Sequence, residues 1–185
     1  MPGAVVTSGE RVTLRTAEPD DAGFLQRGFA DPAIRYPMGS PVLSRAAVRE
    51  RLDGDDGTDR FLVCIDDDAG PTDPDVDALR RVGVVAVEDA DWKRPELTYW
   101  LVPEVHGEGY GSEAVGLAVE YAFRSYAAPA VGAGAYPDND ASRGLLEALG
   151  FEQEGRRRGH YYGDGRYRDL VLYGLLREDW DGPDG

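Results

Sequence analysis

Residues 99–114 read Tyr99-Trp100-Leu101-Val102-Pro103-Glu104-Val105-His106-Gly107-Glu108-Gly109-Tyr110-Gly111-Ser112-Glu113-Ala114. We interpret this order as a strand, a glycine-rich turn and the start of a helix. Because Gly107, Gly109 and Gly111 carry no side chain, the backbone of the turn can approach a ligand closely. The free N–H groups of the first helical turn lie at the positive end of the helix dipole. The stretch therefore predicts a binding site for a phosphate or pyrophosphate group.

Two common glycine-rich nucleotide motifs do not fit this stretch. A P-loop requires Gly-Lys-Ser/Thr, which does not follow the turn, and the dinucleotide-binding fingerprint requires a glycine where Ser112 stands. A glycine-rich turn that binds no ligand is the alternative that the pattern alone leaves open.

The rest of the chain alternates between strand-like and helix-like patterns. Helices are predicted at about 19–29, from Ser44 to the aspartate and glycine cluster that begins at Asp53, over 109–125 and near 139–149. Strands are predicted at 11–15, 61–65, 82–87, 97–102, 131–135, 151–162 and 167–176, and Gly163-Asp164-Gly165 indicates a hairpin between the last two. We expect one domain over residues 1–185, with its core at about 10–180. Its class is α/β (α+β), with a mixed, mostly antiparallel sheet of about seven strands flanked by about four helices.

Residues 66–81 are predicted to form a solvated loop, because they contain six aspartates and two prolines. Asp73, Asp75 and Asp77 have the spacing that opens a calcium-binding EF-hand loop. Ala78 stands where that loop requires glycine and Val84 where it requires glutamate, so calcium binding is rejected.

The charge balance of the chain is strongly acidic. Among its 185 residues, 35 are acidic and 20 basic, which gives a net charge of -15, and Lys93 is the only lysine. This composition lacks the basic footprint of a nucleic-acid-binding protein. We interpret the charge and the scarcity of lysine as halophilic, that is, adapted to a salt-rich cytoplasm, with an ordinary acidic protein as the alternative.

We expect the melting temperature to rise steeply as salt increases from dilute to molar concentration. The Debye length falls from about 10 Å at 0.1 M salt to about 3 Å at 1 M, so salt screens the mutual repulsion of the acidic side chains. Thermal denaturation across this range measures the effect. A melting temperature that stays flat or falls would contradict the salt-adapted interpretation.

The sequence shows neither a membrane-spanning segment nor a signal peptide, and it offers few residues for redox or metal chemistry. No apolar run approaches the roughly 20 residues that cross a bilayer, and residues 1–10 lack the pattern of a signal peptide, so we expect a cytoplasmic location and no membrane association. Cys64 lies in an apolar run and is interpreted as a buried hydrophobe rather than a nucleophile. With one cysteine and two histidines, we expect no metal site.

His106 to Gly111 resembles the Arg/Gln-x-x-Gly-x-Gly/Ala acetyl-CoA signature of the GNAT family of N-acetyltransferases. The resemblance covers nearly the whole chain from Val12 onward. It departs from the family pattern at His106, where arginine, glutamine or an aromatic residue is usual, and at Glu108, where lysine is common. Further stretches are similar to the RimJ/RimL branch, which includes ribosomal-protein N-terminal acetyltransferases: Glu96 to Trp100, Glu113-Ala114, Asn139-Asp140-Ala141-Ser142, Leu149-Gly150-Phe151 and Tyr167-Arg168-Asp169.

The resemblance implies a GNAT-like fold and acetyl-CoA as co-substrate, bound without a metal. It implies an oxyanion donor among the backbone N–H groups at Leu101 or Val102, where the sheet opens for the pantetheine arm. Backbone groups of the turn are expected to bind the pyrophosphate; the residues concerned are His106, Gly107, Glu108, Gly109, Tyr110, Gly111 and Ser112.

Catalytic roles are assigned to a few side chains. Glu96 is the candidate general base, directly or through water, or else a solvated carboxylate. Asn139 is the candidate pantetheine ligand or only a helix cap, and Ser142 is the candidate acid that protonates sulfur. Tyr136 is a second candidate acid or a packing residue. Arg156, Arg157 and Arg158 either attract an acidic substrate or are solvated surface.

The function expected from these residues is transfer of an acetyl group to a primary amine, first of all a protein or peptide N-terminus. Acetylation of a small-molecule amine and a catalytically silent acetyl-CoA-binding module are the alternatives. Neither nucleic acid nor membrane is an expected partner, and a homodimer is left open.

Overall fold

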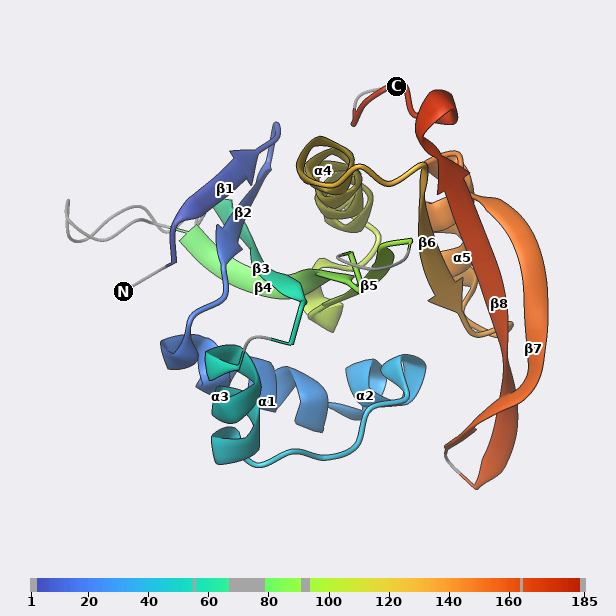
Figure 1. The fold of residues 1–185 in the computed structure, drawn as a ribbon. Helices are drawn as coiled ribbons and strands as arrows, with labels where there is room; N and C mark the ends of the chain where they lie inside the picture. The colour runs from blue at the N-terminus through green and yellow to red at the C-terminus, as the bar shows by residue number, and fades with distance from the viewer. Residues whose placement is uncertain (1–2, 55, 67–78, 91–93, 164, 184–185) are drawn as a thin grey trace.

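The computed structural model describes residues 3–54, 56–66, 79–90, 94–163 and 165–183. Within these ranges eight strands form one open sheet in the order β1-β2-β3-β4-β5-β6-β8-β7 (Figure 1). Neighbouring strands are antiparallel except β5 and β6, which are parallel. The predicted mixed, mostly antiparallel sheet is confirmed. The strands are β1 (Val5–Ser8), β2 (Val12–Thr16), β3 (Asp59–Asp66), β4 (Leu79–Glu88), β5 (Glu96–Leu101), β6 (Ala130–Ala135), β7 (Glu152–Gly163) and β8 (Arg166–Leu176).

In the described part of the chain, five helices cover the two faces of this sheet. Figure 1 shows α4 on one side of strands β2 to β5 and the helices α1 to α3 on the other side. The helices are α1 (Ala22–Ala30), α2 (Pro32–Met38), α3 (Arg45–Asp53), α4 (Tyr110–Ser125) and α5 (Asp140–Ala148), with 3-10 turns at Pro19–Asp21, Pro103–Val105 and Arg177–Asp179.

Strand β5 faces both hydrophobic cores. Because side chains alternate across a strand, Leu97, Tyr99 and Leu101 point to the core that includes α4 and α5. Trp100 points into the other core, where it packs against Phe24 of α1, with ring centroids 5.6 Å apart. Residues on the two faces of β5 are therefore separated by the sheet.

Strands β5 and β6 pair at one end and then diverge. The described pairs are Glu96 with Gly132 and Leu97 with Ala133, whereas β4 pairs with β5 as far as Leu101. Beyond β5, the N–H of Val102 donates to the carbonyl oxygen of Val82 at 2.8 Å. Since the direction of the backbone groups alternates along a strand, the N–H groups of Tyr99 and Leu101 point away from β4. They face the side on which β6 has separated from β5.

One strand and one α-helix were not predicted from the sequence. Strand β1 is a four-residue strand at the edge of the sheet. Helix α2 begins with Pro32 directly after Asp31, whose side chain accepts a hydrogen bond from the N–H of Ala33 at 2.8 Å. This is a standard helix start, with a capping aspartate before a proline at the first helical position.

Some predicted boundaries also need correction. The helix expected from residue 19 starts as a 3-10 turn and becomes α-helical at Ala22. Leu79 to Arg81, expected in a loop, belong to β4. Asp66, expected to begin that loop, is the last residue of β3. Residues 67–78 of the predicted loop, with Asp73, Asp75 and Asp77, lie outside the described residues. The hairpin between β7 and β8 is confirmed by the pair Gly163 and Arg166, while Asp164 lies outside the described residues.

Cys64 lies in β3 and is buried in the core that includes α1 to α3. Burial raises the pKa of its thiol to about 11, so the thiol stays protonated and unreactive near neutral pH. Among the described residues, no helix has the length and apolar character needed to cross a membrane.

Candidate functional site

The first turn of α4 packs closely against both α5 and the end of β5. A Cβ atom added to Gly111 would lie 3.0 Å from Leu145 of α5 and 3.8 Å from Leu101 of β5. The missing side chain therefore lets the beginning of α4 approach α5. This contact brings the glycine-rich turn to the place where β5 and β6 diverge.

The turn before α4 has the geometry of an anion site. Gly107 and Gly109 have φ angles of 81° and 86°, the left-handed region that favours glycine. Gly109 is the N-cap and provides no side-chain acceptor, so the N–H groups of Tyr110 and Gly111 keep their donor capacity. A Cβ atom on Gly107 would meet no described atom within 4 Å. A pyrophosphate group fits this open, donor-lined turn.

Arg11 brings a positive charge to this turn. Residues 103–113 contain three glutamates and neither lysine nor arginine. The Arg11 guanidinium donates to the carbonyl oxygen of Glu108 at 2.9 Å and lies 4.7 Å from the centre of the Tyr110 ring. The Glu113 carboxylate accepts the backbone N–H of Arg11 at 2.7 Å and lies 3.5 Å from its Nε. These contacts hold the β1–β2 turn against the start of α4.

His106 is positioned by the backbone rather than directed at a ligand. Its Nε2 lies 2.9 Å from the carbonyl oxygen of Leu101, and because a carbonyl accepts, Nε2 carries the proton. This hydrogen bond closes residues 102–106 over the end of β5. Of the two predicted oxyanion donors, the N–H of Val102 already donates to the carbonyl oxygen of Val82. The N–H of Leu101 points to the side on which β6 has separated from β5.

Ser142 lies in the first turn of α5 and is held from two directions. Asn139 caps the helix, since its Oδ1 accepts the N–H of Ser142 at 3.1 Å. The hydroxyl of Tyr99 lies 2.7 Å from Ser142 Oγ. Asn139 and Ser142 are thus brought together as predicted, and Tyr99 joins them from β5.

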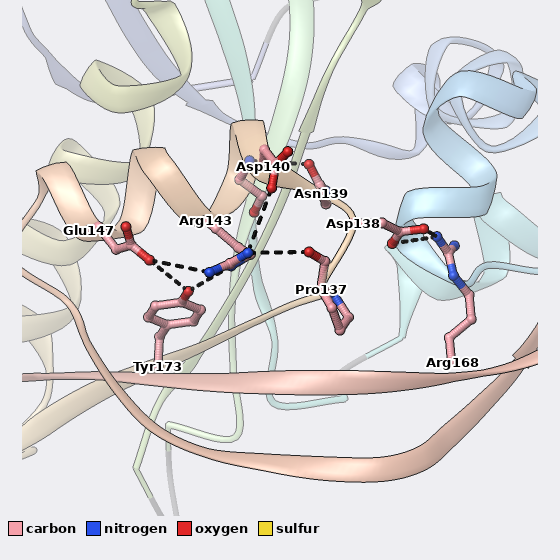
Figure 2. A network of polar contacts seen from close by, with 9 residues as sticks. Pro137, Asp138, Asn139, Asp140, Arg143, Glu147, Arg168 and Tyr173 are labelled. Atoms are coloured by element: carbon pink, nitrogen blue, oxygen red, sulfur yellow. Dashed lines mark hydrogen bonds and ion pairs between the residues drawn. The ribbon is translucent and has the colours of Figure 1, made fainter.

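Figure 2 shows how the segment that leads into α5 is fixed. Arg143 donates to the carbonyl oxygen of Pro137 at 3.3 Å and to the hydroxyl of Tyr173 at 3.2 Å. On the other side of the segment, Arg168 of β8 donates to Asp138 at 2.7 Å. The two arginines restrain the segment from opposite sides, which fixes the position of Asn139.

Glu96 lies at the end where β5 and β6 are still paired. Its carboxylate lies over Gly132, where an added Cβ atom would come within 2.5 Å of it, and accepts from Arg94 at 3.2 Å. Arg94 also binds Glu154 of β7 at 2.7 Å. Along β5, Glu96 is roughly 10 Å from Tyr99 and roughly 16 Å from Leu101, at about 3.3 Å per residue. It is on the opposite face of the sheet from Tyr99.

Tyr136 follows β6 directly and is not brought together with Ser142. Its ring centroid lies 6.2 Å from that of Tyr161, and the Arg168 guanidinium lies 4.6 Å from its ring centre. A Cβ atom on Gly39, after α2, would overlap the Tyr136 hydroxyl. Burial raises the pKa of Tyr136. Its surroundings are aromatic packing between α2, β6 and β7.

The arginine run of β7 is exposed, and Arg156 is paired with Asp169 at 2.7 Å. His160, for which the sequence indicates no role, is exposed on the same strand. Among the described residues, no group of three or more histidine, cysteine, aspartate or glutamate side chains is arranged to hold a metal ion.

Arg11, Tyr99 and Arg143 were not predicted as site residues. The partners of Arg11 and Tyr99 are far away in the chain: Glu108 lies 97 positions from Arg11, and Ser142 lies 43 positions from Tyr99. Arg143 bonds both to the nearby Pro137 and to the distant Tyr173. The one available signal for Arg11 is the uncompensated negative charge of residues 103–113.

The family model of the GNAT acetyltransferase domain matches residues 11–152. The chain is similar to the uncharacterized N-acetyltransferase p20 of Bacillus licheniformis, with 28% identity over 180 residues, 94% of this chain and 97% of p20. It is also similar to the [ribosomal protein uS5]-alanine N-acetyltransferase of Escherichia coli (strain K12), with 36% identity over 84 residues. That match spans 45% of this chain and 43% of the relative.

A solved structure has a similar fold. The spermidine N-acetyltransferase from Vibrio cholerae, determined in complex with CoA and spermine, aligns with a TM-score of 0.79 and 20% identity over 92% of this chain and 98% of that chain. At this identity, the similarity concerns the fold.

Proposed function

The chain belongs to the GNAT family of acetyl-CoA-dependent acyltransferases, and we propose that it transfers the acetyl group to the α-amine of a protein or peptide. The observation that carries this proposal is the meeting of three features: the donor-lined turn before α4, the divergent N–H of Leu101, and Ser142 at the start of α5. These three features can bind three groups of one acetyl-CoA molecule: the turn binds the pyrophosphate, the N–H of Leu101 binds the thioester carbonyl, and Ser142 binds the sulfur. The uS5-acetylating relative supports a protein N-terminus as the acceptor.

On the co-substrate side, the backbone of residues 107–112 binds the pyrophosphate, and Arg11 adds a positive charge beside it. Asn139 and Ser142 contact the pantetheine arm between β5 and α5. His106 acts indirectly, because its hydrogen bond to Leu101 fixes the end of β5.

The chemical step is a direct attack of the neutral amine on the thioester carbonyl. The N–H of Leu101 donates to the carbonyl oxygen as negative charge develops there, a role that suits a preorganised backbone donor. Ser142 donates to the sulfur as the carbon–sulfur bond breaks. Glu96 takes the proton from the amine through water, since its distance along β5 precludes direct contact with a carbonyl at Leu101. Tyr136, which packs between α2, β6 and β7 and not beside Ser142, is the second candidate acid.

A panel of acceptors tests the proposal. Acetyl-CoA turnover is measured in molar salt with N-terminal peptides, spermidine and other small amines. Peptide α-amines are expected to react fastest. Preference for spermidine would favour the small-molecule alternative, and CoA binding without turnover on any amine would favour a silent binding module.

We expect Arg11→Gln to weaken CoA binding about tenfold, which corresponds to about 1.4 kcal/mol, because it removes the cation beside the turn. Isothermal titration calorimetry in low salt measures the Kd. Arg49→Gln, which removes an exposed arginine on α3, is the matched control. The loss is expected for CoA and absent for pantetheine, which lacks phosphate. Equal CoA affinity of the Arg11 variant and the wild type would refute this role.

A further inference from the structure

The Tyr99 hydroxyl is placed to control the proton of Ser142. It lies 2.7 Å from Ser142 Oγ, whereas its 3.5 Å separation from the Ser142 carbonyl oxygen is long for a hydrogen bond. A phenol is the more acidic of the two hydroxyl groups, so Tyr99 is the better donor and Ser142 the better acceptor. Asn139 holds the backbone of Ser142 at the same time. The serine oxygen is therefore fixed, and its own proton is available for another acceptor.

We propose that Tyr99 is a positioning residue for the departing thiolate: it donates to Ser142 Oγ and thereby directs the Ser142 proton to the sulfur. The inference rests on the proposed function. When the amine nitrogen bonds to the carbonyl carbon, the carbon–sulfur bond breaks and its electron pair stays on sulfur. The sulfur accepts a hydrogen bond from Ser142 and later takes a proton from solvent. The extra proton of the amine goes to water and Glu96, while Tyr99 keeps its own.

The surroundings of Tyr99 suit a permanent donor. Its side chain extends from β5 to α5 on the face that includes α4, next to the divergent backbone. Burial raises the pKa of Tyr99 to about 12. The hydroxyl therefore stays protonated over the whole range in which amine acceptors become neutral, and its effect on turnover is expected to be independent of pH there.

Tyr99→Phe is expected to lower kcat about tenfold, by the same factor from pH 7 to 9, with unchanged Kd for CoA. Ser142→Ala is expected to lower kcat more. The double variant is expected to be no slower than Ser142→Ala, because Tyr99 acts through Ser142. Tyr121→Phe is the matched control, since it removes a hydroxyl that donates to Asp59 at 2.8 Å near the other end of α4. It should leave kcat unchanged.

A second measurement does not depend on turnover. The pKa of the thiol of bound CoA is read from difference absorbance against bound desulfo-CoA. It is expected to rise in Tyr99→Phe and in Ser142→Ala, because each variant weakens a hydrogen bond to the thiolate. Ser142→Ala leaves Tyr99 in place and gives this reading even if Tyr99→Phe does not fold.

Three outcomes overturn the inference: full turnover of Tyr99→Phe, kcat losses that multiply in the double variant, or an unchanged thiol pKa in either single variant. A wild type that binds CoA without acetylating any amine contradicts the proposed function instead. In that case the thiol pKa still decides the role of Tyr99.

Discussion

Gly109→Val is expected to abolish measurable CoA binding while the protein stays folded. Gly109 has a φ of 86°, which a β-branched residue rarely adopts, so the backbone of the turn must change to accept valine. The first added atom would also lie 2.9 Å from the Arg11 guanidinium. The substitution therefore disturbs the N–H donors of the turn and displaces their cation together. Calorimetry measures binding, and circular dichroism checks the fold.

Gly165→Val is the matched control for this variant. Gly165 lies in the β7–β8 hairpin with a φ of 75°, and a Cβ atom there meets no described atom within 4 Å. It therefore carries a similar backbone strain away from the turn. Both variants are expected to lose stability, but only Gly109→Val should lose CoA. Unchanged affinity in folded Gly109→Val would exclude this turn as the pyrophosphate site.

The fold was largely predictable because its main elements have strong local signals. The glycines before α4, the apolar periodicity of that helix and the Gly163–Gly165 turn all lie within a few residues of the structure they specify. Strand β1 was missed because a four-residue edge strand has too few positions to show a period. Helix α2 had a readable start at Asp31-Pro32, but Pro37 and Gly39 close behind are typical of a loop.

The site was predictable only where its residues are close in sequence. Asn139 and Ser142 are three residues apart and share a helix, so their proximity follows from the helical repeat. The sequence alone could not decide whether Leu101 or Val102 is the better candidate oxyanion donor. Only the pairing with β4 shows that the N–H of Val102 is already bonded. Tyr99 and Arg11 depend on contacts between distant elements, which no local pattern specifies.

Glu96→Gln is expected to lower turnover by about 10² to 10⁴-fold with nearly unchanged affinity for acetyl-CoA. The amide keeps the size of the side chain but cannot take a proton. Glu96 lies on the face of β5 opposite Tyr99, which separates proton removal from departure of the thiolate. Steady-state kinetics with a peptide acceptor gives kcat, and calorimetry gives the Kd.

The pH dependence of turnover by Glu96→Gln shows whether the variant has lost proton removal from the amine. A peptide α-amine has a pKa near 8 and is partly neutral at pH 7, whereas a lysine amine with a pKa near 10.4 is almost wholly protonated. Raising the pH supplies more neutral nucleophile and makes a base less necessary. At pH 9 an α-amine is mostly neutral, whereas a lysine side chain is still mostly protonated. The variant should therefore approach wild-type activity at pH 9 on an α-amine and remain far below it on a lysine side chain.

Glu154→Gln tests whether Glu96 acts as a base or only holds Arg94 in its ion pair. Glu154 binds the same arginine as Glu96, with Arg94 Nη1 2.7 Å from its Oε2, but lies on β7. If Glu96 is the base, Glu154→Gln keeps most of its activity and shows no pH rescue. Equal losses in both variants would mean that the carboxylates act by holding Arg94 in place. Full activity of Glu96→Gln at every pH would make Glu96 a surface carboxylate and assign proton removal to another group.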